Sequence, residues 1–401
     1  MTLGRGHGAT ALWVTTARRS TSTVKVWNPN VITLGAGTNR SVVYTDTDGT
    51  QVALTLSGPG VATLTFEGVV GQTVARTRLT AEGPAELRSV HIADSTAATR
   101  LNIRAARGGD ALVTIGDVRA PSGLATIGAR NVNLAGEVNV GGLLRSATFN
   151  TMSGATIAAG SIGSVLAYGA VNDTDVRASD PAGARPTVGR LTFRAPAKEL
   201  NFDAAGGVGS IAGSSFSDST FDAMSFRVVT VTGSLVNSEL RAFAPLGRDT
   251  VLRSLAVGDQ MTGSTIKTAG NIGTVAVHAM NGSRIYAGQV DPDISPDGLP
   301  EVVEGATIAS IAIRPMNRLT PSTFADSVIA AATIRSARLG TVITENADEA
   351  FGLVADQIGS LTATNESGGK LSLRRLDDPT TIDAVLLATG FTFNDFVIRV
   401  F

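Results

Sequence analysis

The sequence predicts an all-β protein: a parallel β-helix, or β-solenoid, behind an irregular or sandwich-like N-terminal β cap. Short runs of Val, Ile, Thr and Leu alternate with small polar residues from about Val24 to Phe401, which is the period of strands. Few stretches keep the i, i+3, i+4, i+7 spacing of a helix. Two short phrases also recur along the chain, and recurrence at near-constant spacing indicates stacked structural units.

The first phrase is an aliphatic residue, Gly, Ser or Thr, and a second aliphatic residue. It occurs at Ile162–Val165, Val208–Ile211, Ile272–Val275 and Ile358–Leu361, and in relaxed form at Val188–Leu191 and Leu339–Val342. Side chains alternate between the two faces of a strand, so both aliphatic residues reach one interior only if the chain bends between them. We expect the Gly to permit that bend.

The second phrase is an aliphatic residue followed two positions later by a small one. It occurs at Ile157/Ala159, Val176/Ala178, Leu240/Ala242, Ile266/Thr268, Ile285/Ala287 and Val328/Ala330. A unit of about twenty residues cannot bury its own apolar face, whereas a stack of such units can. The alternative is an antiparallel sandwich in which Gly marks hairpins, but a sandwich gives no reason for the corner phrase to recur.

The chain divides into four expected segments. They are a disordered leader at 1–23, a β-rich domain or cap at 24–107, solenoid coils at 108–382 and a C-terminal cap at 383–401. The 24–107 segment differs because Asp-Gly and Gly-Pro-Gly turns separate its strands, so it is either a small sandwich or the first irregular coils. Caps are expected because a linear stack exposes open strand edges at its ends.

Composition excludes several classes of function. The 33 basic and 34 acidic residues of this 401-residue chain give a formal net charge of −1, which excludes a strongly basic nucleic-acid binder. The chain has no Cys, so it forms neither disulfides nor thiolate metal sites. Aromatic residues make up 5%, too few for a base-stacking platform. No apolar run is long enough for a transmembrane helix.

Parallel β-helices often carry polysaccharide-cleaving enzymes, so we searched for their chemistry. The phrases of the pectin-hydrolase family appear only in scattered order, at Gly6–Gly8, Asn172–Asp175, Asp377–Asp378 and Arg284–Tyr286. Glycoside hydrolysis needs two carboxylates within about 10 Å of each other, and the sequence places no such pair. We therefore name no catalytic residue and favour a protein that is not an enzyme.

The remaining titratable residues favour ordinary surface roles. The nearest approach to a lyase cluster is Asp173, Asp175, Arg177 and Asp180, which we interpret as an exposed polar loop. Of the three histidines, His7 lies in the Gly6–Gly8 phrase of the expected leader, and His278 lies in an expected strand with its imidazole outward or hydrogen-bonded; the third is His91.

Calcium is the one cofactor that the sequence suggests. Asp46-Thr47-Asp48-Gly49 is half of an Asp-x-Asp-x-Asp-Gly calcium loop, without its third acid and distal Glu. We name Asp46 and Asp48 as candidate metal ligands, and a tight turn is the alternative interpretation. A second acidic loop carries Asp291, Asp293 and Asp297, where a solvated loop is favoured over a metal contact.

The corner phrases resemble those of long, Gly- and Thr-rich secreted proteins of planctomycete-type bacteria and, more broadly, of adhesin-like parallel β-helix proteins. The residues that carry the resemblance are Ser161–Val165, Asn271–Val275 and Gln357–Leu361, and Tyr44–Gly49 is similar to the opening of domains in such surface proteins. The resemblance implies an exported, extracellular or cell-surface protein of structural or adhesive type. The chain departs from the pattern because no signal peptide is visible: Ala11–Val14 is too short for one.

The expected function is therefore that of a non-enzymatic extracellular or cell-surface structural or adhesive β-solenoid, whose outward Thr, Ser, Asn and Arg residues give a neutral, hydrophilic surface. The alternative is a carbohydrate-active parallel β-helix enzyme, a polysaccharide lyase or hydrolase. Binding would come from the loops at 180–187, 243–250 and 287–304. Expected partners are extracellular polysaccharides or other surface proteins, not nucleic acid, and self-association as in a trimeric fibre is a further option.

Overall fold

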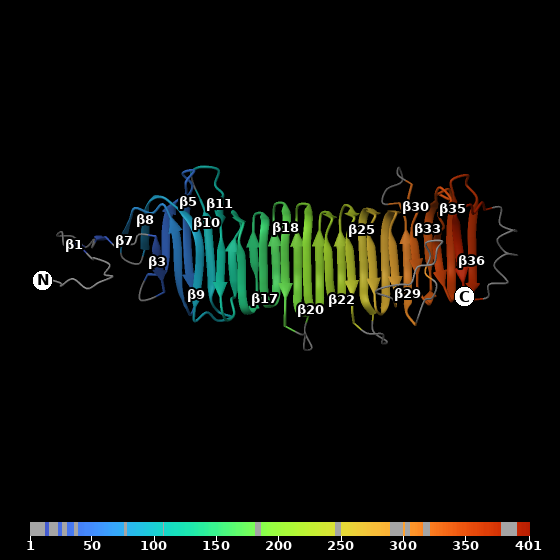
Figure 1. Cartoon of the computed structure of the whole chain (residues 1–401), viewed down its shortest axis with the longest axis horizontal. Helices are drawn as coiled ribbons and strands as arrows, with labels where there is room; N and C mark the ends of the chain where they lie inside the picture. Colours follow the sequence, from blue (N-terminus) through green and yellow to red (C-terminus); the bar gives the residue numbers. More distant parts are fainter. Residues whose placement is uncertain are drawn as a thin grey trace. The chain divides into compact units, whose positions relative to one another are not determined.

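The computed structural model shows an all-β protein. It describes residues 13–15, 23–25, 30–35, 39–75, 78–106, 108–180, 186–244, 250–288, 300, 305–315, 321–377 and 391–401. Strands make up 69% of it, and the described residues form no helix. β1 (Trp13–Thr15) and β2 (Thr23–Lys25) form a separate antiparallel pair, and the other strands belong to one large, mostly parallel sheet (Figure 1).

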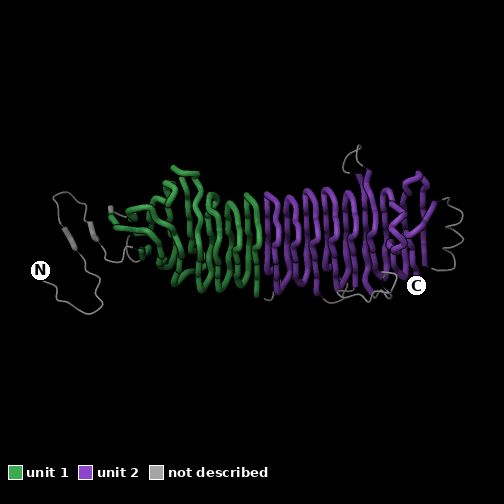
Figure 2. The backbone as a smooth tube through the Cα atoms, turned by 45° about the horizontal axis from the view of Figure 1, so that its top comes forward, with its two compact units in different colours: residues 1–179 green, residues 180–401 purple. Residues whose placement is uncertain are grey.

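The chain comprises two compact units, residues 1–179 and 180–401, called unit 1 and unit 2 (Figure 2). The expected segment boundaries at 23, 107 and 382 stay predictions. Most of the expected leader at 1–23 and the first part of the expected C-terminal cap at 383–401 lie outside the described residues.

Unit 1 opens with strands that pair mainly antiparallel. Strand alternation dictates their packing, since the inward residues Val52, Leu54 and Leu56 are fully buried while their neighbours are exposed or partly exposed. β3 and β9 flank β6, β4 and β10 flank β5, and β7 pairs with β8. The strands are β3 (Val31–Leu34), β4 (Ser41–Thr45), β5 (Gln51–Ser57), β6 (Val61–Glu67), β7 (Gly71–Ala75), β8 (Arg78–Pro84), β9 (Glu86–Ala93) and β10 (Arg100–Ala105).

The rest of unit 1 is parallel. β9, β12, β15 and β17 form one ladder, and β10, β13, β16 and the end of β17 form another. A third ladder runs through β11, β14, β17 and β18. The strands are β11 (Val113–Ile115), β12 (Asp117–Ala120), β13 (Thr126–Ala129), β14 (Val132–Leu134), β15 (Glu137–Leu144), β16 (Ala147–Phe149), β17 (Met152–Ala167) and β18 (Val171–Ala178).

Unit 2 consists of three parallel ladders, called A, B and C. The long strands bend from one ladder into the next, so β20, β22, β25 and β27 each contribute to two or three of them. The strands are β19 (Val188–Phe193), β20 (Ala197–Gly213), β21 (Phe216–Ser217), β22 (Thr220–Val231), β23 (Leu235–Val236), β24 (Glu239–Ala242), β25 (Thr250–Thr262), β26 (Thr265–Thr268), β27 (Asn271–Asn281), β28 (Arg284–Ala287), β29 (Thr307–Ile313), β30 (Thr323–Ala325), β31 (Val328–Ala330), β32 (Thr333–Ile334), β33 (Ala337–Val342), β34 (Phe351–Ala355), β35 (Gln357–Asn365), β36 (Lys370–Leu376) and β37 (Phe396–Val400).

Each ladder of unit 2 stacks one buried residue per strand, apolar at every position except Asn365 at the end of ladder C. In ladder A the column is Val188, Val208, Phe226, Leu252, Ile272, Ile308, Ile334 and Ile358. In ladder B it is Phe202, Phe221, Leu240, Ile266, Ile285, Ile329, Leu353 and Ile398. In ladder C it is Ala197, Phe216, Leu235, Met261, Met280, Phe324, Val342 and Asn365.

The first sequence phrase marks ladder A, and its inward orientation is confirmed. Ile162 in unit 1 and Ile272 and Ile358 in unit 2 are at most 1% exposed. Leu339 and Val342 of the relaxed phrase in β33 are also buried, but this phrase does not mark ladder A: Ile334 of β32 holds the ladder A position, and Val342 pairs within ladder C. The ladder also contains members without the central Gly, such as Leu252-Arg253-Ser254-Leu255.

The Gly of that phrase has another role than the expected one. Gly163, Gly209 and Gly273 do not adopt positive φ, so the bend does not depend on glycine's conformational freedom. A Cβ at Gly273 would overlap the carbonyl oxygen of Arg253, its neighbour one strand earlier. Glycine there allows a close approach of two backbones.

The second phrase marks the buried columns of ladder B and its equivalent in unit 1, with one error of register. Ile285 pairs with Ile329, so the equivalent of Ile285/Ala287 is Ile329/Ala331 and not Val328/Ala330. Val328 and Ala330 belong to the opposite side of the strand, where they form a second buried apolar cluster with Tyr286 and Val354. Both faces of the sheet are therefore buried at β28, β31 and β34.

The C-terminal end of unit 2 is rich in aromatic packing. β36 pairs antiparallel with β35, and β37 pairs parallel with β34. Phe396 lies within 6.2 Å, centroid to centroid, of Phe324, Phe351, Phe391 and Phe393. Among the described residues there is no helix with the length and apolarity that a membrane crossing requires.

Candidate functional site

Asp46 and Asp48 lie in the tight turn between β4 and β5. The carbonyl of Asp46 accepts the N–H of Gly49 at 3.0 Å, and its N–H donates to Thr50 O at 2.7 Å. Asp48 Oδ1 accepts the N–H of Thr50 at 2.8 Å, and its Oδ2 accepts the N–H of Asp110 at 3.0 Å. Asp48 therefore connects the turn to a segment sixty-two residues further along the chain.

The two carboxylates of this turn have opposite electrostatic environments. Hydrogen bonds from the N–H groups of Thr50 and Asp110 lower the pKa of Asp48. Burial raises the pKa of Asp46, and the nearby charges of Asp48, Glu86 and Asp110 raise it further. Burial also raises the pKa of the Tyr44 phenol, whose hydroxyl has no hydrogen-bond partner.

Hydrogen bonds within the protein are sufficient to explain why aspartates occupy positions 46 and 48 of this turn. Donors of the protein already occupy both oxygens of Asp48, and in the described part of the chain no three His, Asp or Glu side chains gather as metal ligands would. Calcium binding by Asp46 and Asp48 stays a prediction.

The other residues singled out from the sequence do not converge on one site. Asp173, Asp175 and Arg177 lie in β18 and not in the expected loop; Asp175 and Arg177 form an ion pair at 2.7 Å, and Asp173 has positive φ. His91 is exposed on β9. His7, the acidic loop at Asp291–Asp297 and most of the three candidate binding loops lie outside the described residues.

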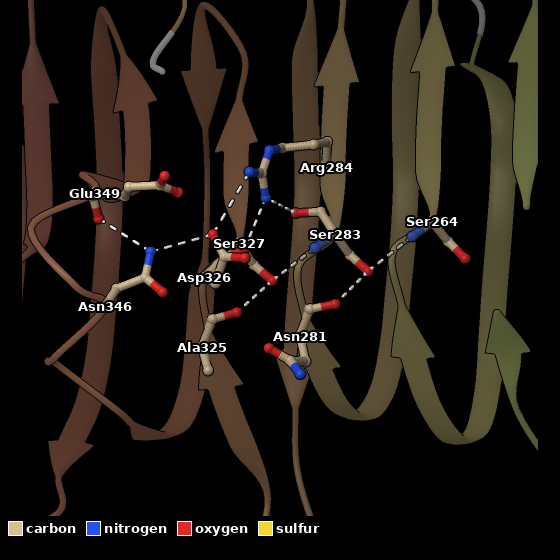
Figure 3. A network of polar contacts seen from close by, with 9 residues as sticks. All are labelled: Ser264, Asn281, Ser283, Arg284, Ala325, Asp326, Ser327, Asn346 and Glu349. Atoms are coloured by element: carbon tan, nitrogen blue, oxygen red, sulfur yellow. Dashed lines mark hydrogen bonds and ion pairs between the residues drawn. The ribbon is translucent and has the colours of Figure 1, made fainter. Parts of the chain in front are cut away.

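Sequence reasoning missed a column of buried serines between ladders C and B. Its members are Ser219, Ser238, Ser264, Ser283 and Ser327, each at most 3% exposed. The N–H of each serine donates to the hydroxyl of the next, at 3.1–3.2 Å. Each hydroxyl donates in turn to the carbonyl two residues before it, at 2.7–3.0 Å. Figure 3 shows the column from Ser264 to Ser327.

A local signal accompanies every serine of the column. The preceding residue has positive φ in each case: Asp218, Asn237, Gly263, Gly282 and Asp326. Asp, Asn and Gly are the residues that adopt this conformation most readily. The same signal precedes Thr174 in unit 1, which is fully buried and donates to Asn172 O at 3.0 Å. The pattern Asp/Asn/Gly followed by Ser after an apolar strand could have been found in the sequence.

Charged and polar side chains form hydrogen bonds and an ion pair beside the C-terminal end of the serine column (Figure 3). Arg284 Nη1 donates to the carbonyl of Asp326 at 2.6 Å, and its Nη2 lies 3.5 Å from Asp326 Oδ1. Asn346 Nδ2 donates to the same Oδ1 at 3.2 Å and to Glu349 O at 3.0 Å. These contacts join β28 to the connections that precede β31 and β34.

A groove of about 530 Å³ lies on the outer face of ladder A. Its floor consists of Thr230, Ala256 and Ala276, which are neighbours in successive strands. His278 and Arg314 line one side, and His278 Nδ1 lies 3.3 Å from Arg314 O. Its described lining residues include no carboxylate, so they do not supply the acid pair that glycoside hydrolysis needs.

Comparisons with protein-family models, with curated proteins and with solved structures gave no match.

Proposed function

We propose that the chain winds as a parallel β-solenoid and serves as a non-enzymatic structural or adhesive protein outside the cell or on its surface. The observation that carries the proposal is the serine column, whose members keep the same partners although 19, 26 or 44 residues separate neighbours. A winding chain that returns to the same corner after inserts of different length would give this pattern. The resemblance to secreted adhesin-like proteins supports the extracellular location.

Two further observations support a mechanical role. Ladder A keeps one buried apolar residue in register over eight strands, from Val188 to Ile358. Buried polar groups of the corner are paired by the serine hydroxyls, so that opening the corner would leave several N–H groups without partners at once. A stack of this kind resists separation of its coils because each coil depends on its neighbours.

Single-molecule force spectroscopy on the full chain tests the structural part. A solenoid held by a corner column should unwind in successive steps, each releasing a length close to one coil, and single release of the whole of unit 2 would contradict it. Secretion is tested by fractionating cells of the source organism and detecting the protein with an antibody. Detection only in the cytoplasm would contradict the location.

The alternative, a polysaccharide lyase or hydrolase, predicts turnover. Acidic and neutral polysaccharides should be incubated with the protein, with and without calcium, and followed by reducing-end and unsaturated-product assays. Clear turnover that disappears in a matched variant of one groove residue, such as His278→Gln, would replace the structural proposal by the enzymatic one.

A further inference from the structure

The outer face of ladder A differs in charge from the rest of unit 2. Exposed arginines lie in its described strands or directly after them, and Arg314 among them lines the groove: Arg227, Arg253, Arg314, Arg335 and Arg338. The same described segments carry two carboxylates, those of Asp259, which accepts the Ser234 hydroxyl at 2.8 Å, and of Asp356, directly before β35. The composition predicts a surface that is neutral as a whole, but the net charge differs from one face of unit 2 to another.

The pairing of charged side chains differs between ladders A and B. None of the five forms an ion pair with a carboxylate in the described part of the chain. On ladder B the opposite holds, since Arg241 pairs with Asp222 and Lys267 pairs with Glu239. The charges of ladder B are matched within the fold, whereas those of ladder A remain available to a partner of opposite charge.

The outward residues of ladder A are mostly small. Two outward rows run along ladder A in strand register: Val228, Ser254, Thr274 and Ser310 in one, and Thr230, Ala256, Ala276 and Ala312 in the other. Arg338 continues the second row, since it pairs with Ala312. Methyl and hydroxyl groups of this size leave room for an extended polymer to lie close to the sheet.

We infer that this face binds an acidic polysaccharide, a linear polymer of uronate-type sugars. Guanidinium groups bind carboxylates in paired, charge-assisted hydrogen bonds, and the methyl-lined floor suits the C–H faces of sugar rings. A nucleic acid fits less well because the described lining of the groove contains no Phe, Tyr or Trp to stack with bases. The inference deepens the proposed adhesive function by giving it a class of partner.

Binding to immobilised polygalacturonate, measured by biolayer interferometry, tests the inference. The double variant Arg314→Gln, Arg338→Gln should bind about tenfold more weakly or worse, since each lost charge-assisted contact reduces affinity by that order. The matched control is Arg100→Gln, Arg104→Gln, which removes two exposed arginines from β10 of unit 1 and should bind as the unaltered protein does. Raising the salt concentration should weaken binding.

A second pair of variants tests the groove itself. Ala276→Glu places a bulky negative charge on the floor and should abolish binding, whereas Ala276→Ser should retain it. Equal binding of the arginine double variant and the unaltered protein would overturn the inference, as would equal binding of polygalacturonate with reduced carboxyl groups, or binding of single-stranded DNA alone. Stepwise unwinding under force is measured without polymer, so failure of the solenoid proposal is seen separately from failure of binding.

Discussion

The hydroxyl of Ser283 accepts the backbone N–H of Ser264 at 3.2 Å, and the carbonyl of Ser264 accepts the N–H of Arg284 at 2.9 Å. Two neighbouring strands are thus joined by one side-chain and one backbone hydrogen bond at the same corner. Both serines are fully buried, so water cannot replace either bond. The corner of unit 2 is fixed by short polar side chains in an otherwise apolar interior.

Replacement of Ser264 by alanine should destabilise the protein by about 1–3 kcal/mol, because the buried N–H of Ser238 loses its acceptor. Urea unfolding followed by circular dichroism measures the change. Ser254→Ala in β25 is the matched control, since Ser254 belongs to the outward row of ladder A, and it should change stability by less than about 0.5 kcal/mol. Equal effects of the two substitutions would show that the column contributes nothing.

The pKa of Asp46 should lie above the ordinary value of 3.8, and the pKa of Asp48 should lie below it. The depressed pKa of Asp48 gives stability that is present above pH 3.8 and is lost as the pH falls through the lower folded-state pKa. The raised pKa of Asp46 gives a penalty that is absent below pH 3.8 and develops as the pH rises through the higher folded-state pKa. NMR titration of the side-chain carboxyl carbons checks both signs, and Asp46 titrating below Asp48 would contradict them.

Calcium should shift the carboxyl signals of Asp46 and Asp48 if these residues form the predicted site. The matching variants are Asp46→Asn and Asp48→Asn, which keep the shape of the side chains and remove their charge. If calcium still shifts the remaining aspartate's carboxyl signal in each of the two variants, the metal binds elsewhere.

Phe396→Ala should destabilise the C-terminal end of unit 2 by about 3–5 kcal/mol, because it removes a fully buried ring from a cluster of phenylalanines. Phe401→Ala is the control, since Phe401 is 49% exposed; its effect should stay within about 0.5 kcal/mol. Thermal unfolding measures both. A small effect of Phe396→Ala would mean that this end of the unit is not held by aromatic packing.

Gly352→Ala should release β37 from β34. Gly352 has φ +141°, and a Cβ there would overlap the carbonyl oxygen of Val397 in the neighbouring strand. Gly154→Ala is a milder comparison, because its φ of +58° costs about 1–2 kcal/mol while its surroundings are open. Hydrogen exchange of the β37 amides checks the result: they should exchange faster in Gly352→Ala and unchanged protection would contradict the prediction.

The sequence predicted the inward columns where a phrase was intact, as at Ile272 and Val275. It misplaced Leu339 and Val328 because the local pattern repeats one ladder away or one residue out of register, and only pairing with a neighbouring strand decides between the two. The groove could not be predicted at all. Its residues Thr230, Ala256, Ala276 and Arg314 are separated in the sequence by connections of unequal length, and they become neighbours only in the folded chain. The serine column carried a local signal, but its partners are likewise distant in sequence.

The number of residues between neighbouring serines of the column differs, and this bears on how the sequence of such a protein can evolve. The step from Ser264 to Ser283 takes 19 residues and the step from Ser283 to Ser327 takes 44, yet both arrive at the same hydrogen bond. The connection between two serines can therefore be lengthened, shortened or exchanged while the hydrogen bonds of the column and the register of the strands stay the same. New surface features could be acquired one turn at a time while the interior stays as it was.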